Sequence, residues 1–247
     1  MRKFMALVYG VVAYAVFFVS FVYAIGFVGN LVVPKSIDSG EESGALAAAL
    51  VNAALLTLFA LQHSVMARPA FKRWWMRFIP KEIERSTYVL LASSVLLLLC
   101  ALWRPIPTVV WQVTDPIGVA VLWSLYALGW IIVFFSTFMI GHFDLFGLKQ
   151  VWLNLRGGVT PSDSFRTPAL YRIVRHPIML GFLVAFWATP VMSVGHLLFT
   201  LATTGYILIA VQLEERDLVA HHGDSYRRYQ REVPAFVPLT KRGTGSS

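Results

Sequence analysis

The sequence contains little cysteine and little charge for its length. Cys100 is the single cysteine among 247 residues, which excludes a disulfide framework and a cysteine-based metal site. Charged residues make up 14% of the chain, whereas 57% of the residues are hydrophobic and the mean hydropathy is +0.65. A chain of this size is too apolar for a water-soluble domain, so the sequence predicts an integral membrane protein surrounded by lipid.

Long apolar segments predict the membrane-spanning helices. A helix needs about 20 mostly apolar residues to cross a bilayer. Uncharged windows of that order occupy 4–33, 44–67, 86–103 and 116–141. A further window, 177–213, is too long for one crossing and has Pro190 and Gly195 near its middle, so we expect a helical hairpin. The predicted fold is all-α and polytopic, with about five to six transmembrane helices and a cytoplasmic interfacial helix.

The basic residues lie on one side of the predicted bundle. Nineteen of the 21 Lys and Arg residues fall in four segments, 1–3, 67–87, 141–177 and 214–247. The positive-inside rule makes these segments cytoplasmic, and with them both termini. The net charge of +8 therefore follows from membrane topology, and we expect no nucleic-acid partner.

No repeat or long polar segment divides the chain, so we expect one membrane domain over 1–240, with parts 1–140 and 141–240. Within 142–156, apolar residues recur at helical spacing, which predicts the interfacial helix. The stretch 157–168, rich in Gly, Ser, Thr and Pro, predicts a loop or lid, and the tail 241–247 is expected to be disordered.

Four polar motifs fall at the predicted cytoplasmic ends of helices. They are Gln62-His63-Ser64, His142-Phe143-Asp144, Arg175-His176-Pro177 and Glu214-Glu215. Ionisable groups at membrane depth usually face a cavity or a partner, so we expect one shared pocket that opens to the cytoplasm. His196 falls at the opposite end and is excluded from this pocket.

The motif at 175–177 suits an anion, because Pro177 fits the first turn of a helix whose free N–H groups lie beside Arg175. The alternative is that Arg175 only marks the cytoplasmic end of the membrane-spanning helix and binds no anion.

Glu214 and Glu215 cannot share one helix face, so one carboxylate can point into the bundle while the other meets solvent. The alternative to a ligand contact is a structural ion pair formed by these glutamates.

A metal site is a further possibility to weigh. Asp217, His221 and His222 are too few for a membrane di-iron centre, and we expect no metal site.

The C-terminal half resembles the superfamily of isoprenylcysteine carboxyl methyltransferases and phospholipid methyltransferases. The resemblance lies in Arg175-His176-Pro177, Gly181, Glu214-Glu215, Gly223, Tyr226, Tyr229 and 233–238. Nearly the whole chain is similar to one branch, the bacterial methanethiol S-methyltransferases, through 62–68, 142–148, 175–181, 186–190, 195–197 and 214–218. Met179 stands where many members of the superfamily carry Tyr, which makes a prenylcysteine substrate less expected.

This resemblance implies a methylation of methanethiol, a small thiol, to dimethyl sulfide with S-adenosylmethionine as the methyl donor. It implies a bacterial enzyme, and we expect it in the inner membrane with its active site on the cytoplasmic side that the basic residues mark. Part 141–240 would hold the cofactor through Arg175, His176, Pro177, Gly181, Glu214, Glu215, Tyr226 and Tyr229.

The chemistry adds a requirement for a base, because the thiolate rather than the thiol is the nucleophile. A base near the acceptor would accept the thiol proton. We expect His142, oriented by Asp144, to be that base, with His63 as the second candidate.

Three alternative functions remain open at this point. One is a methyltransferase of the same superfamily that acts on a lipid or a prenylcysteine. Another is a sterol-type membrane reductase with a nicotinamide cofactor. The third is a non-catalytic membrane assembly factor, against which the presence of both Arg175-His176-Pro177 and Glu214-Glu215 argues. The sequence does not predict the oligomeric state.

Overall fold

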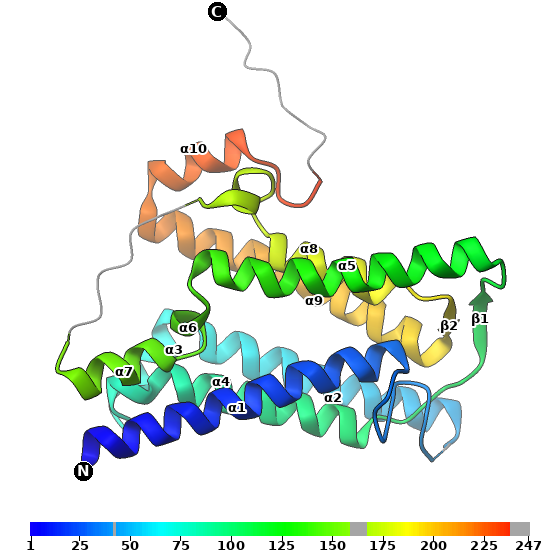
Figure 1. Ribbon diagram of the computed structural model, residues 1–247, viewed down its shortest axis with the longest axis horizontal. Helices are drawn as coiled ribbons and strands as arrows, with labels where there is room; N and C mark the ends of the chain where they lie inside the picture. Colours follow the sequence, from blue (N-terminus) through cyan, green and yellow to red (C-terminus); the bar gives the residue numbers. More distant parts are fainter. Residues whose placement is uncertain (42, 159–166, 238–247) are drawn as a thin grey trace, which may run out of the picture.

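The computed structural model of the protein describes residues 1–41, 43–158 and 167–237 (Figure 1). Within these ranges, five helices are long and apolar enough to span a membrane. They are α1 (Arg2–Gly29), α2 (Ala45–Ala67), α4 (Lys81–Leu102), α5 (Pro116–Ile140) and α9 (Val194–His222). The all-α, polytopic fold predicted from the sequence is thereby confirmed.

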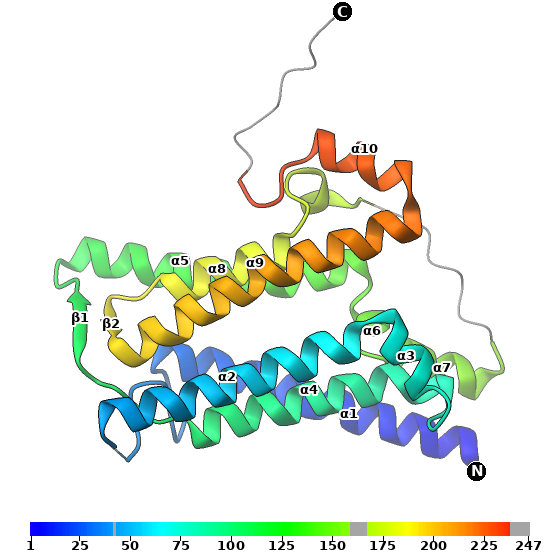
Figure 2. The ribbon, with the colours of Figure 1, turned by 180° about the vertical axis from the view of Figure 1, so that it is seen from behind.

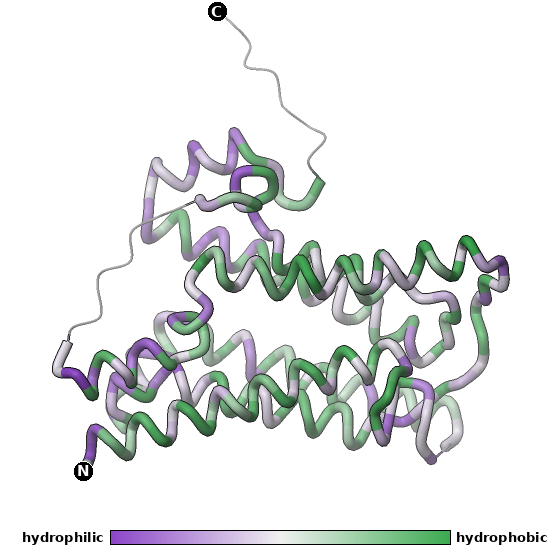
Figure 3. Tube along the Cα trace, viewed as in Figure 1, coloured by the Kyte–Doolittle hydropathy of each residue, from purple (hydrophilic) through white to green (hydrophobic). Residues whose placement is uncertain are grey.

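Shorter elements connect these helices. They are α3 (Pro69–Trp75), α6 (His142–Leu145), α7 (Leu148–Arg156), the 3-10 helix η1 (Ala169–Arg172), α8 (Pro177–Trp187), α10 (Asp224–Glu232) and the strands β1 (Val109–Gln112) and β2 (Val191–Ser193). The long helices are apolar along their length, whereas α10 is mostly polar and α7 mixes apolar and polar residues (Figure 3). The polar elements therefore gather at one end of the bundle.

The spanning helices form two layers (Figures 1 and 2). Helices α1, α2 and α4 pack together in one layer, and α5 packs on α8 beside α9 in the other. Aromatic residues join the layers away from the polar end, where Phe27, Trp103 and Phe199 meet. Helix α5 thus lies in the same layer as α8, which follows it later in the chain.

The crossing of α5 and α8 depends on two glycines. A Cβ atom added at Gly181 would lie 2.6 Å from the Gly129 carbonyl oxygen, and one at Gly129 would lie 2.7 Å from the Gly181 carbonyl oxygen. Nothing larger than hydrogen fits between the two backbones. Gly181, which the resemblance assigned to the cofactor, is therefore a packing residue in this structure.

The predicted hairpin is present, with arms of unequal length. Helix α8 has 11 residues and, at 1.5 Å per residue, reaches about half of a 30 Å hydrocarbon core. The chain then turns through Pro190 into β2, which pairs antiparallel with β1, and α9 begins at Val194. The Ser193 hydroxyl caps α9 by accepting a hydrogen bond from the His196 backbone N–H at 3.0 Å.

The predicted interfacial helix is divided into two pieces, α6 and α7. Gly147 lies between them with φ +88°, and a Cβ atom there would come within 2.6 Å of the Ser86 Oγ atom. This contact from α4 explains the break, which helical periodicity alone does not reveal. Most of the predicted lid, 157–168, and the tail, 241–247, lie outside the described residues.

Candidate functional site

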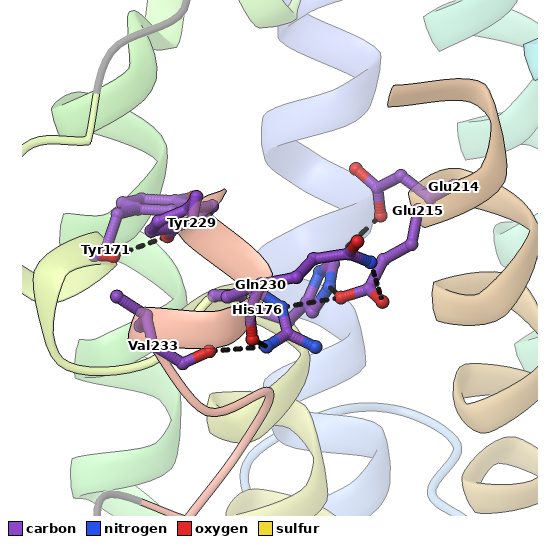
Figure 4. A network of polar contacts seen from close by, with 8 residues as sticks. Tyr171, His176, Glu214, Glu215, Tyr229, Gln230 and Val233 are labelled. Atoms are coloured by element: carbon purple, nitrogen blue, oxygen red, sulfur yellow. Dashed lines mark hydrogen bonds and ion pairs between the residues drawn. The ribbon is translucent and has the colours of Figure 1, made fainter. Parts of the chain in front are cut away.

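The ends of three helices meet around one carboxylate, Glu215 (Figure 4). It accepts hydrogen bonds from Arg175 Nε at 2.7 Å, from His176 Nε2 at 2.9 Å and from Gln230 Nε2 at 2.8 Å. Because an ionised carboxylate only accepts hydrogen bonds, the proton of His176 lies on Nε2. These four residues, here named the Glu215 clamp, tie the start of α8 to the end of α9 and to α10.

Arg175 is committed to the clamp by a second set of contacts. Its Nη1 atom donates to the carbonyl oxygen of Gln230 at 3.1 Å and to that of Val233. Its backbone N–H donates to the Pro234 carbonyl at 2.9 Å, and that of His176 donates to the Ala235 carbonyl at 3.2 Å. Pro177 follows at the first position of α8, as expected, so the motif anchors the segment after α10 as well as starting a helix.

Glu214 behaves differently from its neighbour. Its Oε2 atom lies 3.7 Å from His176 Nδ1, and its side chain keeps 49% of its surface accessible, against 16% for Glu215. Arg68, of the segment after α2, also lies within electrostatic reach of this carboxylate. Glu215 is thus hydrogen-bonded within the protein, while the Glu214 carboxylate remains partly accessible.

Two tyrosines of α10 complete this end of the molecule. Tyr226 and Tyr229 are buried, with ring centroids 5.7 Å apart, and the Tyr229 hydroxyl donates to the Tyr171 carbonyl oxygen. Burial raises the pKa of Tyr229 to about 12 and also raises the pKa of Tyr226, where the Glu215 charge adds to the effect. Both therefore act as neutral phenols around neutral pH.

His142 lies in a second, apolar environment. Its Nδ1 atom is 2.8 Å from Thr137 Oγ1, and its Nε2 atom is 2.7 Å from Tyr14 Oη. The Thr137 hydroxyl donates its proton to the Phe134 carbonyl, so it accepts from His142. The proton of His142 therefore lies on Nδ1, and Nε2 accepts from Tyr14.

Aromatic rings enclose this histidine on its remaining sides. Phe138 stacks on the imidazole at 4.2 Å, and Phe146 meets it edge-on at 4.8 Å. Further rings of the same enclosure, here named the His142 cage, are Tyr14, Phe17, Phe134 and Phe143. Burial lowers the pKa of His142, so the cage favours the neutral imidazole.

The expected pairing of His142 with Asp144 is wrong. Asp144 accepts from Lys149 Nζ at 2.6 Å and from Gln150 Nε2 at 2.7 Å, and so fixes the turn between α6 and α7. Residues two apart on a helix point to different sides, which separates the two side chains. Thr137 orients His142 instead.

His63 lies close to both regions. The Tyr88 hydroxyl is 3.0 Å from His63 Nε2, and the Phe59 ring stacks on the imidazole at 5.3 Å. Tyr88 lies within electrostatic reach of Glu214 on one side. On the other side it shares an apolar cluster with Phe146, which borders the His142 cage. The structure thus gathers the four polar motifs at one end of the bundle.

Several partner residues escaped the sequence analysis. Tyr14, Tyr88 and Thr137 bind the two histidines, and Gln230 completes the Glu215 clamp. The hydroxyl of a tyrosine within an apolar helix usually forms a hydrogen bond to a polar group. The sequence could therefore have indicated Tyr14 and Tyr88 as partners of polar residues. His196 lies at the opposite end as expected, with Nε2 3.1 Å from the Phe186 carbonyl oxygen.

Asp217, His221 and His222, the residues considered as metal ligands, contact other groups. Asp217 forms an ion pair with Arg68 at 2.9 Å, and the His221 ring meets that of His222 edge-on. Within 1–41, 43–158 and 167–237, no three His, Cys, Asp or Glu side chains lie close enough together to hold a metal ion.

Comparison with known proteins places the chain in a family. The model of the family described as NnrU protein matches residues 51–217. Methanethiol S-methyltransferase 2 of Bradyrhizobium diazoefficiens is 61% identical over 232 residues, which cover 94% of this chain and 89% of that protein. Methanethiol S-methyltransferase of Mycobacterium tuberculosis is 56% identical over 244 residues, which cover 99% and 100%. The chain belongs to the NnrU protein family and groups with the methanethiol S-methyltransferases.

More distant relatives extend beyond bacteria. Nurim of Bos taurus is 32% identical to the chain over 172 residues, which cover 66% of the chain and 65% of Nurim. No solved structure matches the chain. The NnrU match includes Glu214 and Glu215 and ends before α10, so the clamp joins the matched region to a helix beyond it.

Proposed function

We propose that the protein transfers a methyl group from S-adenosylmethionine to methanethiol and releases dimethyl sulfide. The observation that carries the proposal is its similarity, over nearly full length, to proteins named methanethiol S-methyltransferase. We also propose that it resides in a bacterial inner membrane with both termini and the site on the cytoplasmic side. The basic segments support this orientation, because Lys and Arg are enriched in cytoplasmic segments of membrane proteins.

The residues at the clamp fit such a methyl donor, which bears an amino group, a carboxylate and a sulfonium. Glu214 offers an accessible carboxylate that suits a positive group. Tyr226 and Tyr229 lie buried beside the clamp, and the Tyr229 hydroxyl, which donates its proton to the Tyr171 carbonyl, can accept a hydrogen bond from a ribose or adenine donor. Arg175 directs Nε and Nη1 into the clamp, so we assign it, with His176 and Glu215, the task of positioning α8, α9 and α10.

S-adenosylmethionine supplies a methyl group activated by its positively charged sulfur. The thiol loses its proton to a base, and its sulfur forms a bond to the methyl carbon as the bond from that carbon to the sulfonium breaks. The protein's task is to align the partners and to keep water out, since positioning dominates such a displacement.

Two histidines are candidates for the base. His142 is neutral and its Nε2 lone pair is reached through the Tyr14 hydroxyl, so a proton would pass by way of Tyr14. His63 has Tyr88 beside it, and Tyr88 lies within electrostatic reach of Glu214. For a base, replacement by alanine lowers turnover and leaves the affinity for S-adenosylmethionine unchanged.

The test uses purified, detergent-solubilised protein and headspace detection of dimethyl sulfide. We expect product with methanethiol and S-adenosylmethionine together, and none without the cofactor. Binding of S-adenosylmethionine without product would reject methanethiol as the acceptor and favour a lipid or prenylcysteine. Absence of S-adenosylmethionine binding, or binding of NADPH in its place, would reject a methyltransferase.

A further inference from the structure

A pocket lies between α2 and α9. Its volume is about 200 Å³, and its walls are mainly apolar. They include Thr57, Phe59, Ala60, Leu198, Ala202 and Tyr206. Pockets for drug-sized ligands measure roughly 300–1,000 Å³, so this one suits a molecule of very few atoms.

One end of the pocket adjoins the polar cluster already described. The Tyr206 hydroxyl accepts a hydrogen bond from the Ser64 hydroxyl at 3.2 Å. Phe59 lines the pocket and also stacks on the His63 ring. A molecule in the pocket therefore lies between two membrane-spanning helices, against Tyr206 and against the Phe59 ring that stacks on His63.

We propose that this α2–α9 pocket admits the acceptor thiol from the bilayer and holds it beside Tyr206 and Phe59, whose ring stacks on His63. The inference rests on the proposed function and adds the location of the acceptor. Apolar walls suit the methyl group, and the Tyr206 hydroxyl can still donate its proton to the sulfur, because toward Ser64 it is the acceptor. The location also favours His63 over the enclosed His142 as the nearer base.

A larger hollow exists along α5, but it differs in kind. It measures about 470 Å³ and is lined by residues of a single helix, from Pro116 to Leu128. A hollow formed by one helix is part of the outer surface and encloses nothing. Its residue Ala120 provides a matched control for substitutions in the α2–α9 pocket.

The first experiment fills the pocket. We expect Ala60→Leu and Ala202→Leu each to lower kcat/KM for methanethiol by about 10-fold or more, with the Kd for S-adenosylmethionine unchanged. Ala120→Leu, on the outer face of α5, is expected to retain wild-type kinetics. If the pocket variants match Ala120→Leu in an active enzyme, the pocket assignment is overturned while the proposed function stands.

A second experiment does not depend on activity. Cys100, the native cysteine, is buried, so a cysteine introduced by Ala60→Cys can be followed separately by its reaction with methyl methanethiosulfonate. We expect dimethyl sulfide to slow this reaction at residue 60 and to leave the reaction of Ala120→Cys unchanged. Equal rates with and without dimethyl sulfide at residue 60 would overturn the proposal, whatever the outcome of the activity assay.

Discussion

The Glu215 clamp and the His142 cage bury the same kind of side chain in opposite surroundings. His176 and His142 are 6% and 4% exposed. His176 lies between two carboxylates, one of them hydrogen-bonded to an arginine. His142 lies between two hydroxyls and a ring of phenylalanines. The comparison teaches that charge holds the helix ends together in the clamp, whereas the cage excludes charge and preserves a neutral imidazole.

The largest expected effect comes from removing the cation of the clamp. Arg175→Met leaves Glu215 without its ion-pair partner and the Gln230 and Val233 carbonyls without a donor. Because the pair is mostly buried, we expect a loss of about 2–4 kcal/mol in the free energy of unfolding. Thermal denaturation in detergent measures this loss, together with protease cleavage after α9 as α10 detaches.

The matched control is Arg227→Met. Arg227 pairs with Asp224 at 3.2 Å on the exposed surface of α10, where an ion pair contributes little. Equal stability of the two variants would contradict the assignment of Arg175 to the clamp.

A smaller effect is expected in the cage. Thr137→Val removes the acceptor of the His142 Nδ1 proton and leaves that N–H buried without a partner. We expect a loss of about 2 kcal/mol in unfolding free energy, and Thr137→Ser, which retains a hydroxyl, should restore most of it. Chemical denaturation of the two variants checks this, and equal destabilisation by both would show that Thr137 contributes its methyl group rather than its hydroxyl.

Substitutions at the two glutamates should affect different properties, ligand binding at Glu214 and stability at Glu215. Glu214→Gln removes the accessible charge, so we expect affinity for S-adenosylmethionine to fall about 10-fold, or 1.4 kcal/mol, with the melting temperature nearly unchanged. Glu215→Gln should lower the melting temperature, because it weakens three hydrogen bonds at once. Calorimetric titration alongside thermal denaturation distinguishes the two, and a reversed pattern would exchange their roles.

The smallest expected effect is the pH dependence of the cage. Burial lowers the pKa of folded His142 below its unfolded value of about 6.5, so the unfolded chain binds this proton more readily. The stability due to the neutral form is complete above that value and declines as the pH falls below it. His142→Gln should therefore make the decline in melting temperature under acid shallower than in the wild type. An unchanged slope would contradict the enclosure of His142.

The sequence predicted the spans well because apolar length is a local property. The window 116–141 corresponds to α5 (Pro116–Ile140), and 44–67 corresponds to α2 (Ala45–Ala67). The hairpin break near Pro190 was also predicted, since proline interrupts a helix wherever the chain goes next. The strand β1 escaped notice, because its partner β2 lies about 80 residues later in the chain.

Features that depend on distant partners could not be predicted. The break at Gly147 depends on Ser86 of α4, and the packing role of Gly181 depends on Gly129 of α5. The polar motifs were found, but the division of tasks between Glu214 and Glu215 depends on where Arg175 and Gln230 reach. Local sequence thus predicted which residues gather, and tertiary packing decides what each one contacts.

The most direct test of the central claim follows the methyl group itself. Purified protein receives methanethiol and S-adenosylmethionine that carries an isotopic label in its transferable methyl group, and mass spectrometry analyses the headspace. The account predicts dimethyl sulfide that carries the label in one of its methyl groups, at a rate that falls in Glu214→Gln. Unlabelled dimethyl sulfide, or none from protein that binds the cofactor, would contradict methyl transfer to methanethiol.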